Sequence, residues 1–225
     1  MIGLKHEYPS VGLMPCGSFG GSQSRSARWR IRRCGCGAIA MTDLLLYVTR
    51  HQRWQAAKRI TEAAACSTIP ADLYDRCCRA LQRAYLPMLP PFGINGMVLA
   101  WGMNAYCRLY RLPLRFRWNM KKSSLWQAIR QSLEQDLPAV LAIGPNLPAF
   151  WRQEKLTLYQ KRGEAYCPAA AVSGHYVTVT AMDHTWLEIS SWGKKYYIRQ
   201  EEYLRYGEQH SLFFAHNTLA VRQKT

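Results

Sequence analysis

The sequence has few acidic residues and no long apolar run. Fourteen aspartates and glutamates stand against thirty lysines and arginines, so the formal net charge is +16. The chain contains no run of about 18 apolar residues, the length that a membrane-spanning helix needs. Residues 1–9 also lack the apolar segment of a secretory signal. We therefore expect a protein that does not span a membrane and that stays in the cytoplasm.

The eight cysteines of the chain do not form a disulfide or zinc pattern. In a reducing cytoplasm thiols stay free, so we expect no disulfide bonds. Cys34 and Cys36 are separated by a single residue, closer than the spacing of about two to four residues in zinc knuckles, and no second pair follows them. We therefore expect neither a metal site nor a cofactor.

The excess of basic residues favours an acidic partner of some kind. These residues are dispersed, however, with the densest cluster at residues 25–33 and a weaker one at 108–117. No nucleic-acid-binding motif accompanies them. The aromatic and basic stretch 106–118 is better explained by a core helix with a basic outer face, followed by a strand. We expect a solvated basic surface, with an acidic partner possible and nucleic-acid binding disfavoured.

Helical patterns fill the first two-thirds of the chain and strand patterns the last third, which predicts an α+β fold. We expect one domain with an N-terminal loop and basic segment (1–33), a mainly helical lobe (34–150) and a mainly antiparallel sheet lobe (151–225). Trp29 and Ile31 alternate with arginines, which predicts a short extended segment there. The predicted helices cover 37–50, 54–65, 71–85, 94–109 and 123–133, with a turn or two at 201–205. The predicted strands cover 114–118, 137–144, 156–160, 175–182, 186–190, 195–199 and 212–222.

Two cysteines, Cys34 and Cys36, directly precede the first long predicted helix. A helix N-terminus carries about half a positive elementary charge, which favours the thiolate. Cys36 lies nearer the helix and follows a glycine, so we favour it as the nucleophile, with Cys34 as the alternative. A cysteine nucleophile needs an imidazole to take its proton. His175 begins a strand of period-two alternation, and Gly174 before it permits close approach of the backbone.

These stretches resemble the papain-like cysteine peptidases, especially the bacterial branch that includes the bacteriocin-leader-processing peptidases. The resemblance rests on Cys36-Gly37-Ala38-Ile39-Ala40 at a helix start, on Gly174-His175-Tyr176-Val177 at a strand start, and on Ser190-Ser191-Trp192-Gly193. It covers roughly residues 20–205. It implies a helical lobe packed on an antiparallel sheet, with the site in the cleft between them.

The resemblance also implies roles for individual residues. Cys36 would be the nucleophile, His175 the base, Ser190 the residue that orients the imidazole, and Gln23 an oxyanion donor beside the Cys36 backbone N–H. The family has Asn or Asp at the third position, where Asp183 is a carboxylate alternative to Ser190. It also has its glutamine about six residues before the cysteine, whereas Gln23 lies thirteen before Cys36, so the segment between them must loop out.

Two readings of function follow. The first is a thiol hydrolase that cleaves a peptide or amide bond, and acyl transfer to another acceptor would use the same residues. The second is a degenerate papain-like fold that binds an acidic partner. The serine at the third position and the displaced glutamine favour the second reading.

Overall fold

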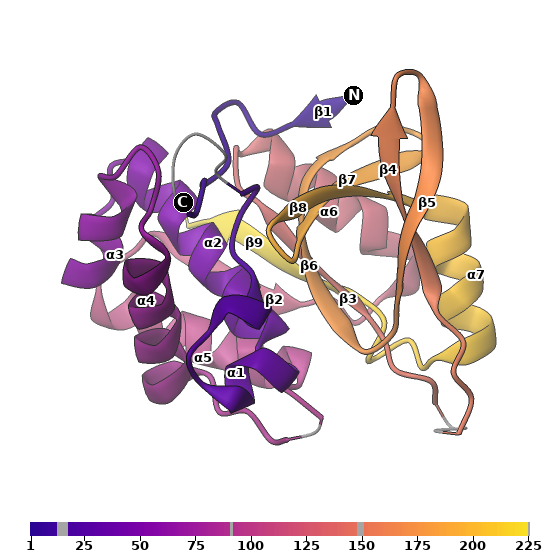
Figure 1. Ribbon diagram of the computed structural model, residues 1–225, viewed down its shortest axis with the longest axis horizontal. Helices are drawn as coiled ribbons and strands as arrows, with labels where there is room; N and C mark the ends of the chain where they lie inside the picture. The colour runs from indigo at the N-terminus through magenta and orange to yellow at the C-terminus, as the bar shows by residue number, and fades with distance from the viewer. Residues whose placement is uncertain (13–17, 91, 148–150, 225) are drawn as a thin grey trace.

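The protein combines helices with one antiparallel sheet, which confirms the predicted α+β class. The computed structural model describes residues 1–12, 18–90, 92–147 and 151–224. Figure 1 shows α1 to α5 gathered at one side of the molecule and the strands β4 to β8 at the other, with α7 beyond them. None of the helices in the described part of the chain combines the length and the hydrophobicity that crossing a membrane requires.

The sheet has the strand order β2-β9-β3-β6-β7-β8-β4-β5, and the short β1 pairs with β6 beside this path. Neighbouring strands are antiparallel throughout. Strands from the first two-thirds of the chain therefore lie in the same sheet as the C-terminal ones. The strands are β1 (Ile2–Gly3), β2 (Leu114–Trp118), β3 (Ala139–Ile143), β4 (Leu156–Arg162), β5 (Ala165–Val172), β6 (His175–Met182), β7 (Trp186–Ser191), β8 (Lys194–Arg199) and β9 (Thr218–Gln223).

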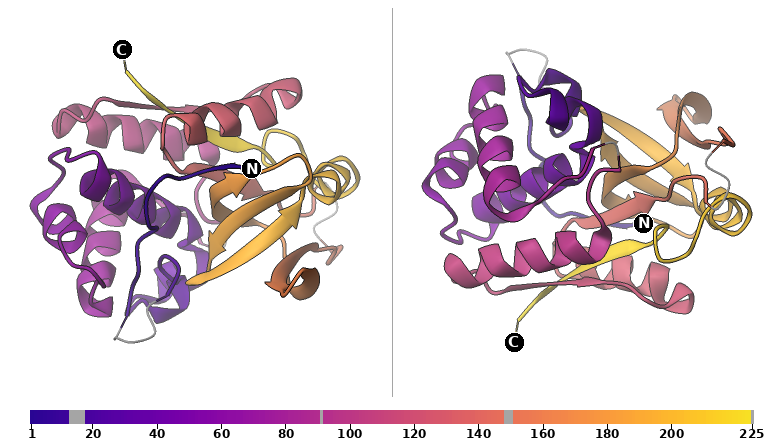
Figure 2. Two further views of the ribbon diagram at one scale, coloured as in Figure 1. Left: turned by 90° about the horizontal axis from the view of Figure 1, so that it is seen from above. Right: turned by 90° about the horizontal axis from the view of Figure 1, so that it is seen from below.

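Seen from above and below in Figure 2, α5 and α6 lie along the side of the molecule that carries β2 and β9. Single turns of 3₁₀ helix occur at η1 (Gln23–Arg25) and η2 (Lys122–Ser124). The helices are α1 (Trp29–Cys34), α2 (Cys36–His51), α3 (Lys58–Ala64), α4 (Ala71–Tyr85), α5 (Gly96–Leu109), α6 (Leu125–Glu134) and α7 (Gln200–His210).

Helix α2 is the central helix, because thirteen of its sixteen residues are buried and most of these are apolar. Its residues Leu44, Leu45 and Leu46 are all fully enclosed, so α2 contacts protein on every side. One hydrophobic cluster surrounds α2 and reaches α4, α5 and β2. A second cluster joins α6, α7 and β3 to β8. The start of α2 therefore lies where the helices meet the sheet, against β6.

Several predicted elements have different bounds or a different form in the structure. The segment around Trp29 and Ile31 is helical and not extended: Ile31 and Cys34 are buried one turn apart, while Trp29 is exposed. The predicted strand 212–222 is shorter, because residues 212–217 form turns and β9 begins at Thr218. The predicted turn at 201–205 is a full helix, α7, and β5 was not predicted.

Candidate active site

Cys36 is the first residue of α2, directly after the N-cap residue Gly35. The helix is sixteen residues long, so its dipole is well developed at Cys36. Cys36 is partly buried, whereas Cys34 is buried at the end of α1 and its thiol donates to the Arg30 carbonyl at 3.0 Å. Cys34 is therefore already engaged inside its own short helix, and Cys36 is the thiol at the start of the long helix.

His175 is the first residue of β6, as predicted. It is 8% exposed, and its Nε2 hydrogen-bonds to Ser191 Oγ at 2.9 Å. Gly174 adopts φ +60°, a left-handed conformation that other residues rarely adopt. A Cβ at this glycine would have its nearest neighbour at 3.8 Å, so Gly174 is needed for its backbone conformation and not for close approach.

Trp192 stacks on the His175 imidazole, with ring centroids 4.7 Å apart and an interplanar angle of 25°. Trp192 and Gly193 form the turn between β7 and β8 with φ values of +50° and +74°. A positive φ is uncommon for a bulky residue and costs about 1–2 kcal/mol. The Ser191 hydroxyl comes from the last residue of β7 and the stacked ring from the turn that follows, so the imidazole is held from two sides.

Cys36 and His175 line one small cavity between the start of α2, the start of β6 and the end of β7. Its volume is about 10 Å³, which is room for about one water molecule. The four residues to which the resemblance assigns a catalytic role, Cys36, His175, Ser190 and Gln23, all line this cavity. The cavity is lined by Gly21, Gln23, Cys36, Ile39, Ala40, Asp43, His175, Tyr176, Thr178, Ser190, Ser191 and Trp192.

Burial decides the charge of the central pair. It raises the pKa of the Cys36 thiol, and hydrogen bonding to the backbone of Tyr176 and Gly37 opposes this rise only in part. Burial lowers the pKa of His175 to about 4. At neutral pH the resting site therefore holds a protonated Cys36 thiol and a neutral His175 imidazole. The Tyr176 contact also places the thiol against the second residue of β6.

The segment before α1 brings Gln23 to the cavity across its separation of thirteen residues from Cys36. Most of the basic residues between them lie in α1, so this segment loops out between Gln23 and Cys36. Gln23 Nε2 donates to the Arg32 carbonyl at 3.0 Å, and its Oε1 is buried without a hydrogen-bond partner among the described residues. Gln23 thus lies in the cavity wall with one of its two amide N–H groups engaged.

Asp43, two turns along α2 from Cys36, holds this segment in place. Its carboxylate accepts from the Gly21 backbone N–H at 3.0 and 3.1 Å, from Tyr74 at 2.6 Å and from Tyr8 at 3.3 Å. Burial is the largest cause of a pKa raised from 3.8 to about 7, and these donors lower it in part. A Cβ at Gly21 would lie 2.0 Å from the Tyr74 hydroxyl, so only glycine allows this approach.

Ser190, the predicted orienting residue, lines the cavity but does not contact the imidazole in the structure. Its hydroxyl donates to the Phe19 carbonyl at 2.7 Å, and the imidazole partner is the next residue, Ser191. Successive residues of a strand point to opposite faces, so a shift of one residue changes which hydroxyl meets the ring. Asp183, the carboxylate alternative, caps the turn after β6 by accepting from Thr185 and Trp186 and takes no part in the site.

The other cysteines within the described ranges do not line this cavity. Burial raises the pKa of Cys77, Cys78 and Cys107, to about 11 for Cys77 and about 12 for the other two. Cys16 lies outside the described residues. Within the described ranges, no group of three or more His, Cys, Asp or Glu side chains is placed to hold a metal ion.

Sequence reasoning missed three contributors to the site: Ser191, Trp192 and Asp43. Asp43 had a signal, since it is the only acidic residue in the apolar stretch that forms α2. A buried carboxylate needs hydrogen-bond donors, so its position pointed to a polar cluster against the helix. Ser191 and Trp192 lay inside the quoted Ser-Ser-Trp-Gly stretch, but the register of the strand could not be read from it.

Comparison of the chain with protein-family models, with curated proteins and with solved structures finds no match. The assignment of a function therefore depends on the geometry of the site and on the resemblance of its motifs.

Proposed function

We propose that the protein is a papain-like thiol hydrolase that cleaves a peptide or amide bond. The observation that supports this proposal most directly is the shared cavity of Cys36 and His175, in which Ser191 bonds the imidazole and Trp192 covers it. A nucleophile beside a base that a third group orients is the arrangement that covalent acyl transfer needs.

In the proposed reaction the Cys36 sulfur attacks the substrate carbonyl while its proton passes to His175. The nitrogen that does not contact Ser191, Nδ1, is the acceptor. His175 then returns the proton to the departing amine, which leaves a thioester on Cys36. Water attacks the thioester while His175 takes its proton, the proton then passes from His175 to the departing Cys36 sulfur, and the acid product leaves the restored site. The backbone N–H of Cys36 at the helix start is suited to stabilise the oxyanion.

A second candidate is a catalytically degenerate papain-like fold that binds an acidic partner. It is favoured by the small cavity, since ligand sites usually measure about 300–1,000 Å³. The Gln23 amide, which already donates to Arg32, also favours it.

Incubation with a pool of synthetic peptides, followed by mass spectrometry of the products, separates the two candidates. The hydrolase should produce new peptide termini that disappear in both Cys36→Ala and His175→Gln, whereas Cys34→Ser should retain them. Products that persist in Cys36→Ala, or no cleavage by the folded wild-type protein of any peptide in the pool, would reject the hydrolase in favour of the binding module.

A further inference from the structure

A groove on the face opposite the viewer of Figure 1 concentrates positive charge away from the candidate active site. It crosses the outer face of β2 and β9 between α5 and α6 and has a volume of about 760 Å³. It shares no lining residue with the Cys36 cavity. Five of its lining residues are cationic, and none is acidic: Arg115, Arg117, Lys121, Arg222 and Lys224.

These cations are not neutralised within the described part of the chain, where none of the five forms an ion pair. Arg115 and Arg222 are direct cross-strand partners in the β2–β9 pair. Like charges directly opposite each other on one face of a sheet are destabilising. An arrangement that costs stability in the free protein is relieved when an anion binds between the two guanidinium groups.

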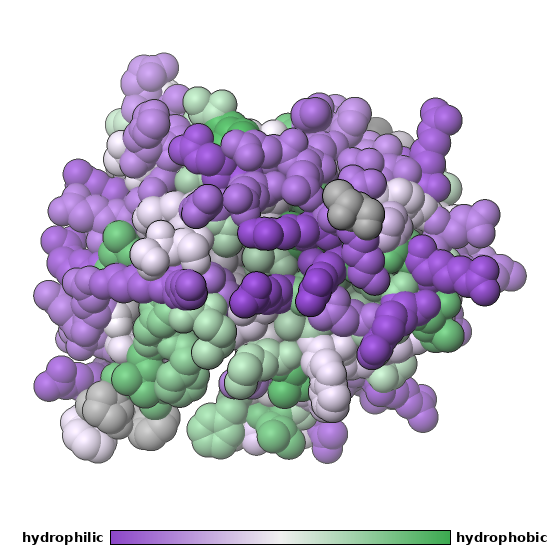
Figure 3. All heavy atoms as spheres, turned by 180° about the vertical axis from the view of Figure 1, so that it is seen from behind, coloured by the Kyte–Doolittle hydropathy of each residue, from purple (hydrophilic) through white to green (hydrophobic). Residues whose placement is uncertain are grey.

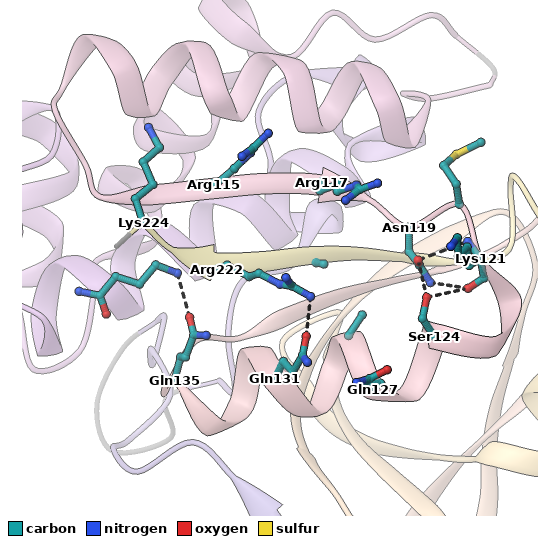
Figure 4. A pocket seen from close by; sticks show the side chains of 14 residues that line it. Arg115, Arg117, Asn119, Lys121, Ser124, Gln127, Gln131, Gln135, Arg222 and Lys224 are labelled. Carbon is teal, nitrogen blue, oxygen red and sulfur yellow. Dashed lines mark hydrogen bonds between the residues drawn. The ribbon is translucent and has the colours of Figure 1, made fainter.

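The groove also carries amide groups at regular intervals. Gln127 and Gln131 of α6 and its C-cap residue Gln135 recur every four residues and face the groove, as Figure 4 shows. Gln131 accepts from Arg222, and Gln135 accepts from the Gln223 backbone N–H at 2.8 Å. Each glutamine keeps an amide NH₂ donor, so the wall opposite α5 can donate hydrogen bonds to carbonyl or carboxylate oxygens.

The β2 edge of the sheet, which borders the groove, is covered at its centre, which disfavours addition of a partner strand there. The side chain of Asn104 on α5 bonds both backbone groups of Phe116 in β2, at 2.7 and 2.9 Å. A partner must therefore be recognised through the side chains on the sheet face. Arg115 and Arg117 both project there, about 7 Å apart as residues i and i+2 of a strand.

An apolar hollow adjoins the basic groove and shares Arg117 and Met120 with it. Met97, Trp101 and Met120 line this hollow and are 57%, 76% and 58% exposed. Figure 3 shows this face, with long hydrophilic side chains across its middle and hydrophobic ones gathered below. Exposed methionines and an exposed tryptophan are typical of surfaces that bind apolar side chains of a partner.

We propose that the basic groove and its apolar hollow bind an acidic segment of another protein, whose carboxylates pair with the arginines and whose apolar side chains enter the hollow. A peptide fits better than nucleic acid, because no aromatic ring lies among the cations of the basic groove and the exposed ring of Trp101 lies in the hollow beside methionines. The amide donors of α6 match the carbonyl groups of a polypeptide. The proposal does not depend on the chemistry of Cys36.

Fluorescence anisotropy with a short labelled peptide of glutamates and leucines tests it, alongside an all-glutamate peptide and an oligothymidylate of similar charge. The variant is Arg115→Gln/Arg222→Gln, and the matched control is Arg83→Gln/Arg162→Gln, which removes two exposed arginines of α4 and β4. The groove variant should bind the Glu/Leu peptide at least about tenfold more weakly, a loss of about 1.4 kcal/mol, and the control should bind like the wild type.

Relief of the Arg115–Arg222 repulsion should also raise the urea midpoint of the groove variant, so weaker binding cannot be attributed to unfolding. Trp101→Ser should weaken binding of the Glu/Leu peptide more than that of the all-glutamate peptide, and Cys36→Ala should leave both unchanged. Tighter binding of oligothymidylate, lost in the same variant, would overturn the choice of a peptide. Equal losses of peptide affinity in the groove and control variants would show that binding depends only on net charge, and they would overturn the proposed site.

Discussion

The pH dependence of stability should reveal the buried carboxyl of Asp43, which ties the segment before α1 to the central helix. Two opposing effects act on it in the structure. Burial favours the neutral carboxyl, while the Gly21 N–H, Tyr74 and Tyr8 donate to the ionised form. Burial is the larger, and it raises the pKa from 3.8 to about 7. The replacement Asp43→Asn removes the titration and keeps a side chain of the same shape.

The direction in which stability changes with pH follows from the linkage between proton binding and folding. The unfolded chain releases the Asp43 proton near pH 4 and the folded protein only near pH 7, so the stabilisation is complete below pH 4 and is lost as the pH rises to 7. The difference between 3.8 and about 7 corresponds to about 4 kcal/mol of unfolding free energy. His175 and His216, with pKa values lowered to about 4, act in the opposite direction below pH 6.5. The pH dependence of the wild-type unfolding free energy therefore combines the effect of Asp43 with those of the two histidines.

The informative quantity is the difference in unfolding free energy between Asp43→Asn and the wild type, measured by urea titration from pH 4 to pH 8. It should shift in favour of the variant by about 1.4 kcal/mol per pH unit up to pH 7 and then level off. A pH-independent offset is expected from the altered hydrogen bonds and does not affect the slope. A difference that stays constant with pH would mean that the three donors outweigh burial, and it would refute the reasoning.

The remaining predictions concern single residues. Ser191→Ala should slow alkylation of Cys36 about tenfold through loss of the imidazole partner, and Ser190→Ala should slow it less; the reverse order, by mass spectrometry of the labelled protein, would reject the observed pairing. Gly174→Ala should lower stability by about 1–2 kcal/mol in urea unfolding, because its φ is positive; an unchanged midpoint would refute this. His216→Asn should reduce the loss of stability between pH 6.5 and 4 seen in acid titration, since burial lowers the His216 pKa to about 4; an unchanged acid limb would contradict it.

Elements with a clear period were predictable from the sequence. The helix at 71–85 and the strand at 175–182 were predicted with the bounds that the structure has. The basic segment was misread because the alternation of Trp29 and Ile31 spans too few residues to distinguish a strand from a helix. The buried pair Ile31 and Cys34, three residues apart, carried the helical signal.

Strand β5 gave little signal, because it is an edge strand with mostly exposed or partly exposed side chains. It also contains Pro168, and proline within a strand pattern normally argues against a strand. The ladder to β4 shifts register between Leu158 and Tyr159, where the partner changes from Ala170 to Pro168. Such an irregularity accommodates the proline and is a product of tertiary pairing that the local sequence does not encode.

For the site, the sequence located Cys36, His175 and Gln23 in what the structure gives as one cavity. Local motifs suffice for Cys36 and His175, because each begins an element, whereas Gln23 was named from the family resemblance. The identity of the imidazole partner could not be obtained in the same way. It depends on the register of β7 and on the Trp192–Gly193 turn, which only the assembled sheet determines.

The most direct test of the central claim, that His175 takes the proton of Cys36, is the pH dependence of Cys36 alkylation by iodoacetamide. It is measured by mass spectrometry in a Cys34→Ser background, with and without His175→Gln. With a neutral imidazole as the base, the rate should be nearly constant from pH 5 to 8, and in His175→Gln it should rise about tenfold per pH unit as free thiolate forms. The same steep rise in both proteins would show that His175 does not act on Cys36 and would contradict the account.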